Sequence, residues 1–528
     1  MGALFRFFRA TQKSARRELK KIGKRRGNRG FFEKRNKSMN KPVFYISALL
    51  IICFSVYGAA FNEHASASFL SIQGFLVTNF GWFYMSVVAL FFFFILSIAF
   101  SRYGSVRLGP DDSRPDYTFF TWTAMLFSAG IGVGLMFFGV AEPITHFARP
   151  PVGEGGTPQA AEKAMLITYF HWGLQAWGTY ILVGLALAYF AYRKGLPLTI
   201  SSALYPLIGE KIHGALGNTV NILAVLGTMF GIATSLGLGV MQVNAGLNYQ
   251  FGLEVSGLNQ VFIIGVITLI ATASVVAGLN SGIKRLSQAN AILALFLLLF
   301  LLIAGPTALL LNSFVQNLGN YLSNMVSLGF QMYAYESTDW MGGWTLFYWA
   351  WWISWSPFVG MFIARISRGR TIREFVVSVL LMPVGFTFVW LSVFGNTALF
   401  LELNGSGAGI SEAVLNDMPT ALFVLLEKLP WASVVSLVAI ILIVIFFVTS
   451  SDSGSLVIDI ITSGGGERAP VWRRVFWAVS QGVVASVLLL AGGLSALQTA
   501  SISSAFPFAV VMLFICLGLL KGLQHERD

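Results

Sequence analysis

An unusual density of tryptophan marks the middle of the 528-residue chain, in the stretch WTLFYWAWWISWSPF at 344–358. If this stretch is helical, at about 100 degrees per residue, most of its aromatic side chains share one face about 100 degrees wide. That face holds Trp344, Tyr348, Trp351, Trp352 and Trp355. An interfacial aromatic belt would cluster at the helix ends, whereas this stripe runs about three turns inward.

A second aromatic group occurs in HWGLQAWGTY, where Trp172, Trp177 and Tyr180 share one side of a helix. Rings from two such helices can form a box. A cation that cannot donate hydrogen bonds, such as trimethylammonium, is held there by ring faces, each contributing about 0.5–2 kcal/mol when desolvated. The two stretches therefore predict a site for a quaternary ammonium group.

Glycines interrupt another apolar stretch, FSAGIGVGLMFFGVAEP, at Gly130, Gly132 and Gly134. Close helix packing would favour a four-residue spacing, so the alternating spacing favours local unwinding. Unwound backbone inside a bilayer must line a cavity or be buried in protein. Its free amides can bind an anionic group and its carbonyls a cation.

Hydroxyl groups gather in FFVTSSDSGS, which contains Thr449, Ser450, Ser451 and Asp452. Such hydroxyls often bond only to the preceding helical turn. Together with freed carbonyls they also suit a small hard cation, and Na+ is the natural candidate for a transporter.

No enzyme signature accompanies these groups, and no cofactor is expected. The five histidines (His64, His146, His171, His213 and His525) lack metal-ligand spacing, and there is no phosphate loop or nucleophile elbow. His171, beside Trp172, is interpreted as a packed residue. The two cysteines, Cys53 and Cys516, lie in opposite terminal spans and give no information about disulfides.

The composition determines the medium that surrounds these residues. The chain is 56% hydrophobic and only 11% charged, against roughly 25% charged residues in a soluble domain. Runs of about 20 apolar residues recur, which predicts an all-α polytopic membrane protein rather than a barrel. Twelve spans are expected, at 43–61, 82–101, 117–141, 163–192, 218–250, 258–279, 289–311, 341–366, 374–400, 431–461, 471–490 and 500–520.

Basic residues set the expected orientation. With both termini in the cytoplasm, only Arg149, Lys163 and Lys428 of the 35 Lys and Arg lie outside. Fifteen of these basic residues lie in the first 42 residues. That segment is expected to lie on anionic lipid of the inner leaflet rather than on nucleic acid, and it does not resemble a signal peptide.

Three motifs resemble those of the betaine/carnitine/choline transporter family: the segment 343–375, AGIGVGLMFFGVAEP and TSSDSGS. The resemblance extends over all twelve expected spans. It implies a homotrimer in the cell inner membrane with a LeuT-type fold. The implied parts are a basic cytoplasmic tail (1–42), two peripheral transmembrane helices (43–116), a first five-helix repeat (117–311), an extracellular connection (312–340), a second, inverted repeat (341–520) and a short cytoplasmic carboxyl terminus (521–528).

The resemblance also implies site residues. By this resemblance, the family's substrate box corresponds to six residues of this chain: Trp172, Trp177, Tyr180, Trp351, Trp352 and Trp355. The glycines Gly130, Gly132 and Gly134 would face the substrate carboxylate. One Na+ site maps to Ser128, Ile131, Phe446, Thr449 and Ser450. A second Na+ site, with Thr228 and Phe358, is doubtful because Ile232 occupies its other hydroxyl position.

The implied function is import of a quaternary-ammonium compatible solute by sodium symport. Gly134 stands where similar choline carriers often have an aspartate, which favours a zwitterion such as glycine betaine. Three alternatives stay open: a proton-coupled choline or carnitine carrier, a carrier of dimethylsulfoniopropionate or ectoine, and a receptor that binds the same cation without moving it.

Overall fold

The computed structural model describes residues 39–129, 132–277, 282–336, 338–405, 409–466, 470–524 and 526 of the chain. The described residues are almost entirely helical, with one isolated β-bridge between Arg107 and Thr371. The basic tail that was expected to lie on anionic lipid falls outside them, apart from its last four residues.

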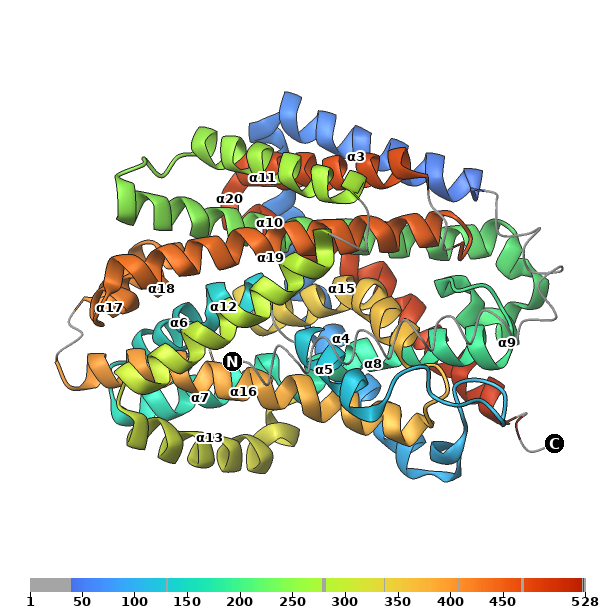
Figure 1. Cartoon of the computed structure of the whole chain (residues 1–528), viewed down its shortest axis with the longest axis horizontal. Helices are drawn as coiled ribbons and strands as arrows, with labels where there is room; N and C mark the ends of the chain where they lie inside the picture. The colour runs from blue at the N-terminus through green and yellow to red at the C-terminus, as the bar shows by residue number, and fades with distance from the viewer. Residues whose placement is uncertain are drawn as a thin grey trace.

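The described helices range in length from three residues to 54 residues, and Figure 1 shows their arrangement. In chain order they are α3 (Lys41–Ala60), α4 (Asn62–Phe100), η1 (Arg102–Ser105), α5 (Phe119–Ala129), α6 (Val133–Ala148), α7 (Pro158–Trp172), α8 (Leu174–Ala188), η2 (Tyr189–Arg193), η3 (Ile200–Leu204), α9 (Tyr205–Ile208), η4 (Gly209–His213), α10 (Ala215–Phe251), α11 (Gly257–Ala277), α12 (Gly282–Ala304), α13 (Thr307–Leu328), α14 (Trp340–Gly343), α15 (Thr345–Ile366), α16 (Ile372–Leu403), α17 (Ile410–Asn416), η5 (Met418–Thr420), α18 (Ala421–Glu427), α19 (Ala432–Thr462) and α20 (Val471–Gln524).

Nine helices within the described residues are long and apolar enough to cross a membrane. Large apolar side chains cover their outward faces, as at Leu49, Phe100, Leu258 and Ile303, which are between 60% and 81% exposed. Side chains of this kind would be unfavourable in water over so large an area, but they suit lipid. The chain is therefore an all-helical, multi-pass membrane protein.

Helix α15 lies at the centre of the helical assembly and carries the tryptophan stripe (Figure 1). It packs against α8, α10 and α20, and α10 in turn packs against α19 and α20. Every residue from Thr345 to Ser354 is buried. The aromatic stripe therefore faces other helices and not lipid.

Glycines divide one predicted span and separate two others. The span predicted at 163–192 is divided at Gly173, which separates α7 from α8. A Cβ at Gly173 would lie 2.5 Å from the carbonyl oxygen of Tyr169 and from the hydroxyl of Tyr321, so only glycine fits. Helix α20 contains both of the last two predicted spans and bends at Gly492 and Gly493, the second of which has φ +56°.

The segment predicted as an extracellular connection, 312–340, is largely helical. The predicted span 289–311 ends early, because Gly305 and Pro306 terminate α12 at Ala304. Helix α13 then runs from Thr307 to Leu328 and buries only a narrow face. On that face the Tyr321 hydroxyl donates to Gln175 Oε1 (2.7 Å) and accepts from the Leu174 amide (2.9 Å). Helix α13 thereby satisfies the backbone at the α7–α8 break.

The end of α20 is attached to η2 by a charged cluster. Glu526 receives hydrogen bonds from Tyr189 (2.7 Å) and Arg193 (2.5 Å), and Lys194 lies 2.6 Å from its carboxylate. Burial raises the pKa of this carboxyl, but hydrogen bonds from Arg193, Lys194 and Tyr189 outweigh burial and lower it to about 2. Because folding lowers this pKa, the ionised carboxylate stabilises the folded state at every pH above the ordinary carboxyl pKa. The contact therefore persists throughout the neutral pH range.

Candidate functional site

The six predicted box residues come together between α7, α8 and α15. Ring centroids lie 5.0 Å apart for Trp172 and Trp352, 6.0 Å for Tyr180 and Trp352, and 5.4 Å for Trp177 and Tyr180. Trp351 stacks on Trp352 at 4.8 Å, and Trp351 reaches Trp355 at 6.5 Å. All six side chains are buried except Trp355, which is half-buried. In this conformation the rings touch one another directly.

The indole N–H groups hold several of these rings in place. Trp352 donates to the carbonyl oxygen of His171 (2.9 Å), and Trp351 donates to that of Gly231 (3.3 Å). The Trp355 Nε1 atom is buried and has no hydrogen-bond partner among the described residues. A buried donor without a partner costs free energy unless a ligand supplies an acceptor.

Two further rings line the same cluster and were not among the predicted box residues. Phe138 of α6 lies 6.1 Å from Trp351 and 6.3 Å from Trp172. Tyr348, a member of the predicted stripe, lies 5.6 Å from Trp172 and 5.7 Å from Trp352. Phe138 was missed because its helical face is defined only by the packing of α6.

The predicted interruption at the glycines is present as a break between α5 and α6. Gly132 is extended, with φ −164° and ψ −179°, and α6 begins at Val133. Gly134 lies in the first turn of α6, where a Cβ would approach Trp172 Cη2 to 2.7 Å and Trp351 Cη2 to 2.9 Å. Gly130 and Ile131 lie outside the described residues. The amino terminus of α6 therefore abuts the ring cluster.

A buried carboxylate, Glu142, lies on α6 behind the rings. Its Oε2 accepts hydrogen bonds from Trp172 Nε1 (2.9 Å) and from the Tyr348 hydroxyl (2.5 Å). Its Oε1 lies 2.5 Å from His171 Nδ1 and 3.5 Å from His146 Nε2. Glu142 and both histidines are 0% exposed. Glu142 was missed because the predicted span ended one residue earlier, although an acidic residue in an apolar helix is itself a signal of function.

The residues of the predicted sodium site are only partly described. Thr449 donates to the carbonyl oxygens of Ile445 (3.0 Å) and Phe446 (3.1 Å), and it accepts from Asn290 Nδ2 (3.2 Å). Ser450 is half-buried one residue further along α19. Helix α19 contacts α6, which begins at the glycine break. Ile131 and the side chain of Ser128 lie outside the described residues.

The doubtful second sodium site involves α10 and α15, which pack together. Thr228 Oγ1 is buried and lacks a hydrogen-bond partner among the described residues. Phe358 packs edge-on against Trp355 at 5.2 Å. Ile232 is fully buried, and its Cδ1 lies 2.2 Å from where a Cβ of Gly454 would be. The position that would need a third oxygen is thus filled by an aliphatic side chain.

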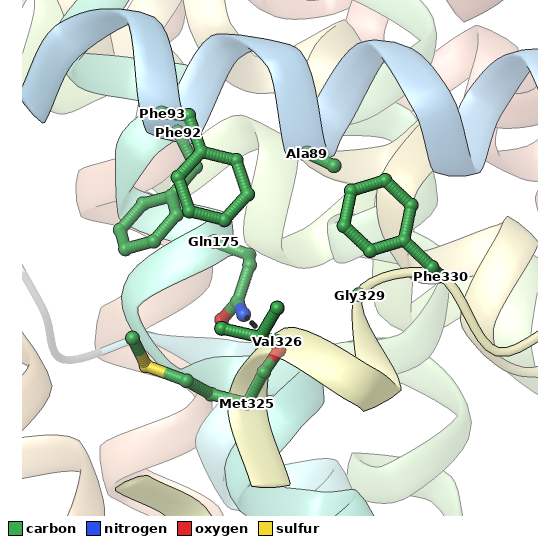
Figure 2. A pocket seen from close by; sticks show the side chains of 8 residues that line it. All are labelled: Ala89, Phe92, Phe93, Gln175, Met325, Val326, Gly329 and Phe330. Atoms are coloured by element: carbon green, nitrogen blue, oxygen red, sulfur yellow. Dashed lines mark hydrogen bonds between the residues drawn. The ribbon is translucent and has the colours of Figure 1, made fainter. Parts of the chain in front are cut away.

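A small cavity lies between α4, α8 and α13 (Figure 2). Its volume is about 10 Å³, roughly the minimum for one water molecule. Figure 2 shows Gln175 pointing from α8 toward α13, where its amide donates to the carbonyl oxygen of Met325 (3.0 Å). This cavity is too small for an organic cation.

Buried aromatic rings, a broken helix and polar groups within an apolar helical assembly are typical of a membrane transporter. The family model for betaine/carnitine/choline family transporters matches residues 42–528. The chain therefore belongs to this family, and it is a transporter and not an enzyme.

Curated relatives share nearly half of the residues. The glycine betaine transporter of Acinetobacter baylyi is 49% identical over 489 residues, covering 93% of this chain and 74% of that protein. A protein of Desulfitobacterium hafniense described as "Probable glycine betaine transporter" is 46% identical, with coverage of 95% and 100%. The high-affinity choline transport protein of Escherichia coli K12 is 45% identical, with coverage of 92% and 72%. Glycine betaine and choline, the solutes in the names of these relatives, are both quaternary-ammonium compounds.

Proposed function

We propose that this protein imports glycine betaine by sodium symport with alternating access. The observation that carries the proposal is the cluster of six rings from α7, α8 and α15 beside the amino terminus of α6. Aromatic faces attract a cation that cannot donate hydrogen bonds. Backbone amides at a helix amino terminus attract an anion. A zwitterion with a trimethylammonium group at one end and a carboxylate at the other matches both.

The rings must separate before the substrate binds. Carbon atoms in contact lie about 3.5–4.0 Å apart, so a trimethylammonium group between two rings needs a wider gap than the 5.0 Å between the centroids of Trp172 and Trp352. A trimethylammonium group between them requires an outward movement of one helix relative to the other. Such a movement between α7–α8 and α15 fits alternating access, in which one helical group moves against another.

Sodium is the proposed coupling ion. Thr449 and Ser450, with the Phe446 carbonyl, would provide oxygen ligands on α19, and Ser128 and Ile131 would complete the site from the broken helix. The contact between α19 and α6 supports this assignment, because it brings the two segments together. The aliphatic side chain of Ile232 favours one sodium ion per substrate.

The proposed architecture follows from the resemblance to the betaine/carnitine/choline transporter family. Twelve spans would form two inverted five-helix repeats after two peripheral helices, in a homotrimer in the cell membrane with both termini cytoplasmic. Helices α5–α6 and α15 would begin the two repeats. The basic amino-terminal segment would bind anionic lipid of the inner leaflet.

Uptake of radiolabelled glycine betaine in cells that lack other osmolyte carriers tests the proposal. We expect uptake against a gradient that is abolished when Na+ is replaced by K+. Sodium-independent uptake that responds to a pH gradient would favour the proton-coupled choline or carnitine carrier. Competition by unlabelled choline, carnitine, dimethylsulfoniopropionate and ectoine would identify the substrate, and binding without uptake would indicate a receptor.

The charge at position 134 provides a test of substrate preference. Gly134→Asp is expected to reduce transport of glycine betaine and to favour choline, because a carboxylate repels the substrate carboxylate and attracts a bare cation. Any side chain there must displace the edges of Trp172 and Trp351. Gly134→Asn is therefore the matched control, since it adds the same bulk without charge. Equal ratios of choline to betaine uptake in both variants would contradict the assignment of Gly134 to the substrate cavity.

Topology can be tested by cysteine labelling in a Cys53→Ala background. Gly155 is unsuitable for this purpose, because a Cβ there would lie 2.2 Å from the carbonyl oxygen of Ala148. The neighbouring Glu154 is exposed. Glu154→Cys is expected to react with an impermeant maleimide in intact cells, whereas Glu210→Cys, also at an exposed position, should react only after lysis. The reverse pattern would overturn the orientation.

A further inference from the structure

The carboxylate of Glu142 is separated from the predicted cation site by one layer of side chains. Its Oε2 accepts hydrogen bonds from Nε1 of Trp172, which is a box residue, and from the hydroxyl of Tyr348, whose ring lies against the box. Its ion-pair partners in the described part of the chain are His146 and His171. In a dry interior, a charge at this position acts strongly on a cation held by those rings.

The hydrogen-bond network assigns the proton on His146. An indole N–H can only donate, so the bond from Trp340 Nε1 to His146 Nδ1 (3.3 Å) makes Nδ1 an acceptor. The neutral ring then carries its hydrogen on Nε2, which faces Glu142 Oε1 at 3.5 Å and has no closer partner in the described residues. His146 therefore adds a polar hydrogen to the carboxylate without adding a charge.

His171 has no such constraint. Its Nε2 lies 2.8 Å from Thr345 Oγ1, and a hydroxyl can either donate or accept. Its Nδ1 lies 2.5 Å from Glu142 Oε1. With a single ring proton on Nδ1, the imidazole is neutral and Glu142 keeps its negative charge. A second proton on Nε2 can be donated to Thr345 without breaking that bond, and the proton between Nδ1 and Oε1 can then rest on either residue. The pair can thus be neutral overall or carry one negative charge.

The spacing fits a shared proton better than a metal ion. Two ligand atoms about 2.1 Å from a metal are roughly 3 Å apart even at right angles. The 2.5 Å between His171 Nδ1 and Glu142 Oε1 is shorter than this. The remaining carboxylate oxygen is also occupied by the donors from Trp172 and Tyr348.

We propose that Glu142 and His171 form a proton-binding site that is linked to the substrate site through Trp172 and Tyr348. The site holds a proton when no cation occupies the box, and binding of a quaternary ammonium group releases that proton to the solution. The ammonium group then provides the positive charge near Glu142 that the proton provided before, while the substrate carboxylate lies at the amino terminus of α6. Because linkage is reciprocal, a proton on the pair must weaken substrate binding by the same factor by which the substrate weakens proton binding.

The inference rests on the proposed function only for the identity of the cation. The test is binding of radiolabelled glycine betaine to the purified full chain at fixed saturating Na+. The pH is varied from about 5.5 to about 8.5, a range wide enough to cover the titration of one group. We expect the dissociation constant to fall with rising pH, by up to about tenfold per unit for one competing proton. In weakly buffered solution, a pH indicator should report proton release when the substrate is added.

Glu142→Gln keeps the size of the side chain and one acceptor but removes the charge. It is expected to bind more weakly and to lose both the pH dependence and the proton release. His213→Gln, at an exposed histidine remote from the box in sequence, is the control and should keep both.

The outcomes separate the two proposals. Absence of glycine betaine binding in the wild-type protein at every pH would contradict the proposed substrate. Binding with a pH-independent dissociation constant and no proton release would leave the substrate in place and overturn the proton site. Retention of the pH dependence in Glu142→Gln would also overturn it. If Glu142→Gln does not fold, the pH dependence of binding and the proton release of the wild-type protein still test the proton site.

Discussion

Replacing Trp352 by leucine is expected to raise the apparent KM for glycine betaine by about tenfold or more. Trp352 contacts Trp172, Tyr180, Tyr348 and Trp351, so it is the ring that connects the two sides of the box. Loss of one desolvated cation–ring contact of about 1.4 kcal/mol corresponds to a factor of ten in affinity. The measurement is the initial rate of uptake as a function of substrate concentration.

The matched control is Trp349→Leu on the same helix. Trp349 is as deeply buried, but its indole N–H donates to the sulfur of Met85 on α4 and not toward the box. Both substitutions remove the same volume, so a general loss of packing affects both. Unchanged KM values in Trp351→Leu, Trp352→Leu and Trp355→Leu alike would falsify the box. A larger rise in KM for Trp349→Leu than for Trp352→Leu would also contradict it.

Removing both hydroxyls at the proposed sodium site should weaken sodium activation and substrate affinity together. If Na+ connects α19 to the broken helix in the state that binds substrate, each ligand raises the affinity for the other by the same factor. Thr449→Ala combined with Ser450→Ala tests this, because it removes both proposed hydroxyl ligands. The competing explanation is that the Thr449 hydroxyl serves only its bonds to its own helix and to Asn290. Uptake measured over a matrix of Na+ and glycine betaine concentrations gives both affinities.

The control for this experiment is Ser436→Ala. Ser436 lies on the same helix, is fully buried, and has a hydroxyl with no hydrogen-bond partner among the described residues. Its loss should change neither affinity. Little change in the double variant would mean that these hydroxyls only bond within the protein. A Hill coefficient for Na+ near two in the wild-type protein would contradict the single site.

The grouping of these rings could be predicted from the sequence because helical periodicity places them on shared faces, whereas the choice of six box residues came from the family resemblance. Trp351, Trp352 and Trp355 are separated by intervals that return to one side of a helix. The break near Gly132 was predictable for a similar local reason, since the glycine spacing matches no packing face. These features depend on neighbours in the chain, and no tertiary information is needed to find them.

The features that were missed depend on packing between distant segments. Phe138 and Glu142 reach the box only because α6 packs against α7 and α16. The interruption at Gly173 was missed because a single glycine is common in a membrane helix, and what requires it here is the Tyr321 hydroxyl from a remote segment. Helix α13 was missed because an amphipathic helix lacks a continuous apolar run.

The direct contact between the box rings has a consequence for leakage across the membrane. Trp351 stacks on Trp352, and Trp172 meets Trp352 edge-on, with no polar group of either ring aimed into the contact. Without substrate, the rings fill the space that the ammonium group would take. Among the described residues, this contact leaves no polar gap between the rings that water or small ions could enter. A box of small polar residues could bind the same solute, but without substrate it would stay hydrated at this point.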